Sequence, residues 1–297
     1  MRQRPNWAMT TLAIAGAALL VNGCEAAPGN ASPAEPQGPV VVAQAPADEP
    51  AVALDGLDTR IRKATADAAA SGANIEAVVL DRNTGQTVSN GTNKPFPIAS
   101  VVKLFIADDL LLQESQGKTK LTPADHSSLD SMLRSSDDGA AQMFWDRSGG
   151  NAVIARVVAR YGLAATTAPY NGHWDVTQST ASDLVRYYAM LLDGTGGLPP
   201  EQADVILSDL AQSTPTGLDG YPQRFGIPDG LSAEPVAVKQ GWFCCWNGSN
   251  QLHVSTGVIG PDRRYVMAIS ALGPGDATAA RATITQAVRT MFPAGRI

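Results

Sequence analysis

The sequence predicts an α+β fold, in which helices flank one antiparallel sheet and an all-helical lobe is inserted between the strands. Two observations predict this architecture. Apolar patterns place a helix and two strands first, a run of helices in the middle, and three strands with a helix last. The chain of 297 residues is 44% hydrophobic and 17% charged, which is typical of a globular protein with a well-buried core.

The domain that we expect over 54–297 begins with a helix and a hairpin. Helical periodicity covers 54–70, where apolar residues recur on one face. A strand follows over 74–81, and a turn leads into a returning strand over 86–90.

A block of helices comes next. Lys94-Pro95-Phe96-Pro97 forbids helix, and the first helix of the block begins near Ser100. Thr122 as N-cap and Pro123 at the first helical position open the second. The expected helices cover about 100–115, 122–133, 139–147, 151–161, 179–193 and 199–211.

The end of the chain returns to strands. We expect them over about 235–243, 251–259 and 264–272, with a closing helix over 276–291. The simplest packing builds one sheet from both ends of the chain and places a cleft between that sheet and the helical lobe.

The segment before the domain has the pattern of an export signal. Arg2 and Arg4 precede an apolar stretch over 10–21 that is too short for a comfortable membrane span. The stretch runs into Cys24 in a sequence that resembles a bacterial lipobox. We therefore expect a lipoprotein signal peptide over 1–23 and a lipid on Cys24 that holds the protein at the outer face of the cell membrane. The alternative is an ordinary secretory peptide with an incidental cysteine.

Residues 24–53 resemble a tether. Six prolines, many alanines and no lysine or arginine lie between positions 25 and 50. Such a segment buries too little apolar surface to fold, so we expect a disordered spacer between membrane and domain.

Charge and cysteine content exclude several partners. Lysine and arginine number 22 and aspartate and glutamate 28, a net charge of −6 that makes nucleic acid a poor partner. Three cysteines are too few for a four-cysteine zinc site, and no metal or organic cofactor is implied.

The first motif with catalytic chemistry is Ser100-Val101-Val102-Lys103, an S-x-x-K sequence at an expected helix start. A spacing of three puts both side chains on one helix face, within hydrogen-bond reach. A serine hydroxyl is a weak nucleophile, and a lysine whose pKa is lowered by burial can serve as its base.

Two further motifs follow. Ser136-Asp137-Asp138 falls in a break between helices, where the simpler interpretation is an N-cap. Lys239-Gln240-Gly241 falls on a late strand, where the simpler interpretation is a solvent-facing lysine on an edge strand. The three motifs occur in the order helix start, interhelical loop and sheet strand.

Together the motifs resemble the S-x-x-K, S-D-N and K-T-G signature of the penicillin-recognising serine enzymes. Over 54–297 the chain therefore resembles class A β-lactamases and their penicillin-binding-protein relatives. The resemblance implies a β-lactamase/transpeptidase-like fold and a serine hydrolase of the β-lactamase or D,D-peptidase type.

The resemblance also implies a catalytic role for each matched residue. Ser100 would be the acylated nucleophile, and Lys103 would be its base or would orient it. Ser136 would relay a proton to the leaving nitrogen. Lys239 would anchor the substrate carboxylate and hold Ser136.

Substrate-binding groups follow in the same way. The backbone N–H groups of Ser100 and Trp242 would form the oxyanion hole, with Gly241 beside it. Asp138 would line the substrate cleft. His253 falls about where class A enzymes often place a carboxylate-binding arginine, although a buried or edge histidine is the alternative.

Three residues depart from the family pattern. Asp138 stands where the family has asparagine, and an ionised carboxylate cannot donate a hydrogen bond to a substrate amide carbonyl. Gln240 replaces a compact threonine. Trp242 replaces a small residue, and we expect it to narrow the groove.

The machinery for deacylation is also incomplete. Class A enzymes use a loop glutamate to activate water, yet no glutamate lies between Glu114 and Glu201. The counterpart stretch, 165–178, offers His173 and Asp175, and the alternative is that one of these two activates water. We expect hydrolysis of an acyl-enzyme to be slow.

Cys244 and Cys245 are adjacent and directly follow the Lys239 strand. The exported compartment is oxidising, so a vicinal disulfide could form between them. The alternative is two small buried thiols.

Two functions remain open. In the first, β-lactams or D-alanyl peptidoglycan peptides acylate the serine, as the four matched polar residues indicate. In the second, a catalytically retired relative binds cell-wall material or a partner protein, as Asp138, Trp242 and the missing glutamate indicate.

Overall fold

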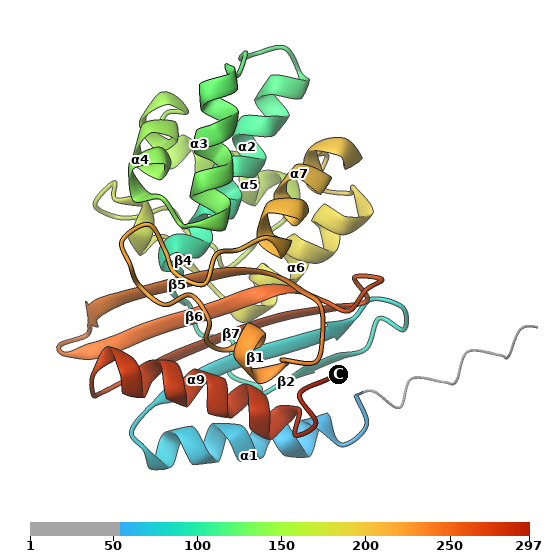
Figure 1. Ribbon diagram of the computed structural model, residues 1–297, viewed down its shortest axis with the longest axis vertical. Helices are drawn as coiled ribbons and strands as arrows, with labels where there is room; N and C mark the ends of the chain where they lie inside the picture. The colour runs from blue at the N-terminus through green and yellow to red at the C-terminus, as the bar shows by residue number, and fades with distance from the viewer. Residues whose placement is uncertain (1–53) are drawn as a thin grey trace, which may run out of the picture. The chain divides into compact units, whose positions relative to one another are not determined.

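A computed structural model describes residues 54–297 of the protein (Figure 1). The expected signal peptide over 1–23, the lipidation site Cys24 and the tether over 24–53 lie outside the described residues. Within 54–297, every helix is too short or too polar to cross a membrane.

Both ends of the described chain build one antiparallel sheet. The strands lie in the order β2-β1-β7-β6-β5, and β1 pairs with β7 over eight residue pairs, from Asn74↔Leu272 to Asp81↔Tyr265. The strands are β1 (Asn74–Asp81), β2 (Thr87–Ser89), β5 (Val236–Trp246), β6 (Asn250–Ile259) and β7 (Tyr265–Gly273). This strand order agrees with the predicted architecture, and it places Lys239, on β5, at an edge of the sheet.

One face of the sheet is covered by α1 (Leu57–Ala70) and α9 (Ala277–Met291), which lie side by side in Figure 1. The helix α1 buries Leu57, Ile61, Ala64 and Ala68, the face that its periodicity predicts. These side chains join an apolar core with residues of β1, β6 and β7.

The other face carries the helical lobe, which is inserted between β1–β2 and β5 (Figure 1). Its helices are α2 (Lys103–Ser115), α3 (Pro123–Arg134), α4 (Asp138–Arg147), α5 (Asn151–Tyr161), α6 (Ala181–Asp193) and α7 (Pro200–Ala211). The helix α2 is central, because all residues from Lys103 to Leu111 are buried. Thr122 caps α3 through a capping box with Asp125, as the sequence predicts.

Several short elements differ from the sequence-based expectation. A 3₁₀ turn, η1 (Ala99–Val102), precedes α2, so Ser100 lies just before the α-helix. The pair β3 (Phe96–Pro97) and β4 (Gln178–Ser179), the turn η2 (Trp174–Val176) and the short helix α8 (Ile227–Gly230) were not predicted. Elements of two to four residues are too short to show periodicity, and tertiary contacts rather than a local pattern determine them.

Candidate active site

Ser100 is held against the edge strand by a close backbone approach. A Cβ atom on Gly241 would lie 2.6 Å from the Ile98 carbonyl oxygen and 3.2 Å from the Ser100 nitrogen. Only glycine therefore lets η1 pack this closely on β5. Ala99 has φ of 47°, a left-handed conformation that costs of the order of 1–3 kcal/mol and often marks functional sites.

Lys103 is the hub of the site. Its side chain is fully buried, and its Nζ lies 2.9 Å from Ser100 Oγ. The same nitrogen lies 2.7 Å from the Ser136 carbonyl oxygen and 3.1 Å from Ser136 Oγ. A fourth contact, of 2.5 Å, joins it to Asp138 Oδ1.

Ser136 reaches the site from the break between α3 and α4. It is nearly buried and has φ of 57°, a second strained backbone position next to the lysine. Its neighbour Asp137 caps α4 by accepting from the Ala140 N–H at 3.0 Å, so the N-cap interpretation of this motif holds for Asp137. The cap fixes the start of α4 and with it the position of Ser136.

Lys239 completes the cluster from the sheet. It lies on an edge strand but is 1% exposed, so the interpretation as a solvent-facing lysine is wrong. Its Nζ lies 3.0 Å from Ser136 Oγ. Contacts of 3.1 Å or less therefore join Ser100 Oγ, Lys103 Nζ, Ser136 Oγ and Lys239 Nζ in one chain.

Burial lowers the pKa of both lysines, whereas the charge nearest to each of them differs. Burial holds the pKa of Lys239 well below its ordinary value, and the nearby charge of Lys103 lowers it further. Burial also lowers the pKa of Lys103, but the carboxylate of Asp138 opposes that shift. Of the two lysines, Lys103 therefore holds a proton more readily than Lys239.

Asp138 lies at the mouth of the site. Its side chain is 67% exposed, and it lines a cleft of about 240 Å³ with Ser136, Gly139, Leu218 and Asp219. A larger cavity of about 650 Å³ runs along α9 and includes none of the matched motif residues. The convergence of polar groups, rather than volume, identifies the candidate site.

Trp242 does not narrow the groove, which corrects the expectation from sequence. Side chains alternate along a strand, so Trp242 faces away from the side on which Gly241 meets η1. Its ring stacks on Tyr221 at 4.7 Å with an interplanar angle of 11°, on the α9 face. The Gln240 amide also faces away, donating to the carbonyls of Gln223 at 3.0 Å and Phe225 at 2.6 Å.

The backbone of Trp242 does face the free edge of the sheet. The Gly260 N–H donates to the Pro235 carbonyl at 3.0 Å, which extends the ladder of β5 and β6 by one pair. Hydrogen-bonded pairs alternate along an antiparallel ladder, so the even-numbered residues of β5 direct their N–H groups outward. The Trp242 N–H is therefore available on the edge beside Ser100.

His253 is a buried histidine and not an open anion site. It is fully buried, and its Nε2 lies 2.7 Å from the Tyr221 hydroxyl. Burial, with a smaller effect from Arg281, lowers its pKa to about 4. A neutral imidazole offers no positive charge to a substrate carboxylate, so the structure does not support that role.

The segment expected to supply a deacylating group presents an indole instead. The ring of Trp174 lies 4.9 Å from Lys103 Nζ, and its Nε1 donates to Gln142 Oε1 at 3.1 Å. His173 is exposed and Asp175 half-buried. Sequence reasoning gave Trp174 no role of its own, although the residue lies between the two candidates.

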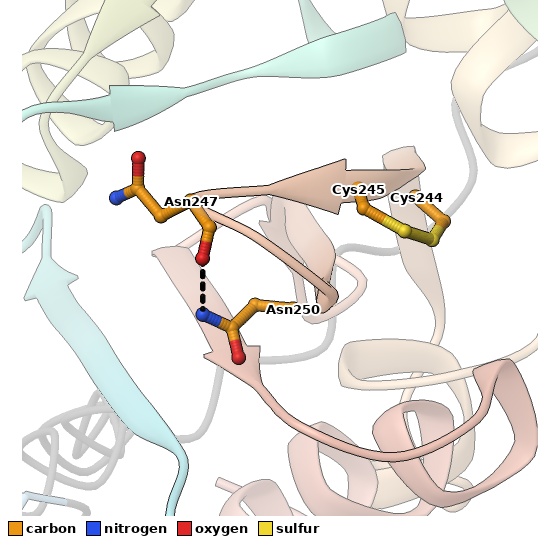
Figure 2. The surroundings of a disulfide bond; sticks show 4 residues. All are labelled: Cys244, Cys245, Asn247 and Asn250. Atoms are coloured by element: carbon orange, nitrogen blue, oxygen red, sulfur yellow. Dashed lines mark hydrogen bonds between the residues drawn. A yellow bond between two sulfur atoms is a disulfide. The ribbon is translucent and has the colours of Figure 1, made fainter.

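Beyond the site, Cys244 and Cys245 are joined in a disulfide near the end of β5 (Figure 2). Both residues are exposed, so the alternative of two buried thiols does not describe them. The hairpin that follows is held by a hydrogen bond of 3.2 Å from the Asn250 side chain to the Asn247 carbonyl.

Comparison with known proteins identifies relatives of the whole domain. A sequence model of the beta-lactamase enzyme family matches residues 56–124 and 127–293. The chain is 64% identical over 254 residues to lipoprotein LppW of Mycobacterium tuberculosis and of Mycobacterium bovis. That match covers 86% of this chain and 81% of LppW.

Solved structures share the fold. PBP-A superposes with a TM-score of 0.65 at 20% identity over 81% of this chain and 96% of that one. A PBP-A variant in an acyl-enzyme complex with penicillin G gives 0.66 at 19% identity with the same coverage. A class A β-lactamase from Mycobacterium abscessus gives 0.61 at 22% identity over 80% and 98% of the two chains. The predicted β-lactamase/transpeptidase-like fold is confirmed.

Proposed function

The chain belongs to the beta-lactamase enzyme family, and on that premise we propose that β-lactams or D-alanyl cell-wall peptides acylate Ser100. The observation that carries the proposal is the chain of contacts from Ser100 through Lys103 and Ser136 to Lys239. Each of these four residues can hold a proton or pass it to the next, because neighbouring side chains lie within hydrogen-bond distance.

The chemistry follows from the positions of these groups. Ser100 Oγ attacks the amide carbonyl carbon and loses its proton to Lys103. Ser136, which touches both lysines, delivers a proton to the leaving nitrogen. Lys239 holds Ser136 in place, and a substrate carboxylate beside it would stabilise its protonated form.

The developing oxyanion is stabilised by backbone N–H groups. The Trp242 N–H faces the free edge of β5, and the Ser100 nitrogen lies close to Gly241 on the same side. Loss of one such donor typically slows acyl transfer by about 10²–10³-fold.

Deacylation is proposed to be slow. An attacking water needs a base near the ester, and the residue of 173–175 that faces Lys103 is the apolar ring of Trp174. An acyl-enzyme would therefore persist long enough to be isolated.

A covalent adduct tests the proposal. Fluorescent penicillin should label the purified protein, with a matching mass increase on the peptide that contains Ser100. Ser100→Ala should abolish labelling, while the matched control Ser135→Ala, one residue before Ser136, should keep it. A parent protein that stays unlabelled would contradict acylation by β-lactams.

A second candidate is a relative that binds without turnover, and the ion pair of Lys103 with Asp138 favours it. In that case the parent protein and Ser100→Ala would bind purified peptidoglycan or a partner protein equally well. Equal retention on peptidoglycan, together with no penicillin adduct, would select this function.

We further propose that the protein is an exported lipoprotein of the cell membrane, lipidated on Cys24. The lipobox-like sequence and the relatives named lipoprotein LppW support this. Labelled palmitate should be incorporated into the parent and not into Cys24→Ser, and the variant should leave the membrane fraction. Palmitate incorporation into both would contradict the assignment of Cys24.

A further inference from the structure

We propose that Asp138 is the counter-ion that keeps Lys103 protonated in the free protein and thereby sets the pH at which Ser100 becomes reactive. The inference rests on the proposed acylation of Ser100. It makes Asp138 a positioning residue with a role that the family's asparagine could not fill, because only a carboxylate carries the charge.

The ion pair is asymmetric in its surroundings. Lys103 Nζ lies 2.5 Å from Asp138 Oδ1, and the lysine side chain is 0% exposed while the aspartate side chain is 67% exposed. The carboxylate keeps much of its hydration. The buried ammonium depends on this partner, because an unpaired charge inside a protein is strongly disfavoured.

Counting hydrogens shows what the proton on Lys103 does. The Ser136 carbonyl at 2.7 Å and Asp138 Oδ1 only accept, so each takes one N–H of Lys103 in either charge state. The third tetrahedral position of the nitrogen is left for the hydroxyls of Ser100, at 2.9 Å, and Ser136. In the ammonium this position is another N–H, which cannot take a proton from Ser100. In the neutral amine it is a lone pair, which can.

Asp138 is the charged group best placed to control that choice. Carboxylates of Asp138, Asp137 and Asp219 all favour the charged form of Lys103, and that of Asp138 has the largest effect. Asp138 alone of the three also forms an ion pair with Nζ. The ring of Trp174 favours the cation as well, whereas burial and the nearby Lys239 oppose it.

The proton balance of the step is simple. Lys103 first releases one proton to solvent. The neutral amine then takes the proton of Ser100 as the bond from Oγ to the carbonyl carbon forms. When the carbon–nitrogen bond breaks, that proton passes by way of the Ser136 hydroxyl to the leaving nitrogen, and Lys103 is neutral again.

The pH dependence of acylation tests the inference. The second-order rate constant for labelling by fluorescent penicillin should rise with pH along a limb that reports Lys103. In Asp138→Asn the midpoint of this limb should fall by one pH unit or more, about a tenfold gain in rate on its acid side. Asp138→Glu should restore the parental midpoint, and Asp219→Asn, which removes a more distant carboxylate, should shift it less. An unchanged midpoint in Asp138→Asn would overturn the inference.

A second measurement does not depend on β-lactams. The ¹³Cε resonance of Lys103, identified by its loss in Lys103→Arg, reports the charge of the amine directly. Its titration midpoint should be lower in Asp138→Asn than in the parent, and equal midpoints would refute the role of Asp138. Failure of the parent to react with penicillin at any pH would instead defeat the proposed function, so the two failures are distinguishable.

Discussion

Gly241→Ala is expected to slow acylation by opening the contact between η1 and β5. The added Cβ would lie 2.6 Å from the Ile98 carbonyl oxygen, whereas ordinary contact begins near 3.4 Å. The opposing atom is backbone, so no side-chain rotation relieves the clash. The two segments must separate by several tenths of an ångström, which moves the N–H groups of Ser100 and Trp242 apart.

The magnitude follows from that displacement. Catalytic groups tolerate errors of about 0.5 Å, and a misplacement of 1 Å can cost about 10²-fold in rate. We expect acylation to slow by about 10–100-fold, and the overpacked contact to lower the free energy of unfolding by about 1–3 kcal/mol.

The assay separates position from stability. Rate constants for labelling by fluorescent penicillin are measured well below the melting temperature of each variant. Gly273→Ala is the matched control, because its Cβ would lie 2.7 Å from the Ala73 side chain, on the strand β7 that β6 separates from β5. It should be destabilised yet acylated at nearly the parental rate. Parental acylation of Gly241→Ala would refute the role of this close approach.

Three further outcomes are expected. Trp174→Ala should shorten the lifetime of the penicillin adduct by threefold or more, because water gains access beside Lys103; mass spectrometry of the adduct over time would show an unchanged lifetime if the indole is irrelevant. Burial lowers the pKa of His253 from 6.5 to about 4, so its contribution to the free energy of unfolding should be fully present above pH 6.5 and fall by at most about 3 kcal/mol as the pH drops toward 4. Melting curves of His253→Asn should lack this pH dependence. Arg264 lowers the pKa of Asp81 from 3.8 to about 2, so the pair should add about 2 kcal/mol to the free energy of unfolding above pH 3.8, and this contribution should be lost as the pH falls through 2. Urea unfolding at a series of pH values should show a weaker acid dependence in Asp81→Asn than in the parent, and an equal dependence would show that the pair contributes nothing.

The long elements were predictable because each carries its own periodic signal. The face of α1 and the cap of α3 could be read locally, and the observed bounds lie within a few residues of the expected ones. The strand β5 extends to Trp246, past its expected end at 243, because β6 continues to pair with it. Pairing partners of this kind are invisible in a local pattern.

The sequence predicted which polar residues converge but not how their charges pair. Spacing and order indicated Ser100, Lys103, Ser136 and Lys239, which the structure brings together. The sequence also showed that Asp138 cannot donate to a substrate amide. Its ion pair with Lys103 could not be foreseen, because it depends on how α4 is placed against α2.

The orientation of Trp242 was within reach of the sequence. Once Gly241 is assigned to the groove face, strand alternation places the next side chain on the opposite face. The size of Trp242 suggested a narrower groove, but its odd or even position along the strand determines which face of β5 carries its side chain. Tyr221, on which it stacks, comes from a loop whose path the sequence does not reveal.

The energetic cost of the cluster argues that it is used. Ala99 and Ser136 both hold left-handed backbone, and two lysines are buried within hydrogen-bond distance of one hydroxyl. Apolar residues of similar volume would often be neutral or more stable at such buried charged positions. A fold that served only as a scaffold would gain by relaxing these features. Their joint presence around Ser100 therefore favours acylation over a purely binding role, and the proposed effect of Asp138 would then fall on the reactivity of Ser100.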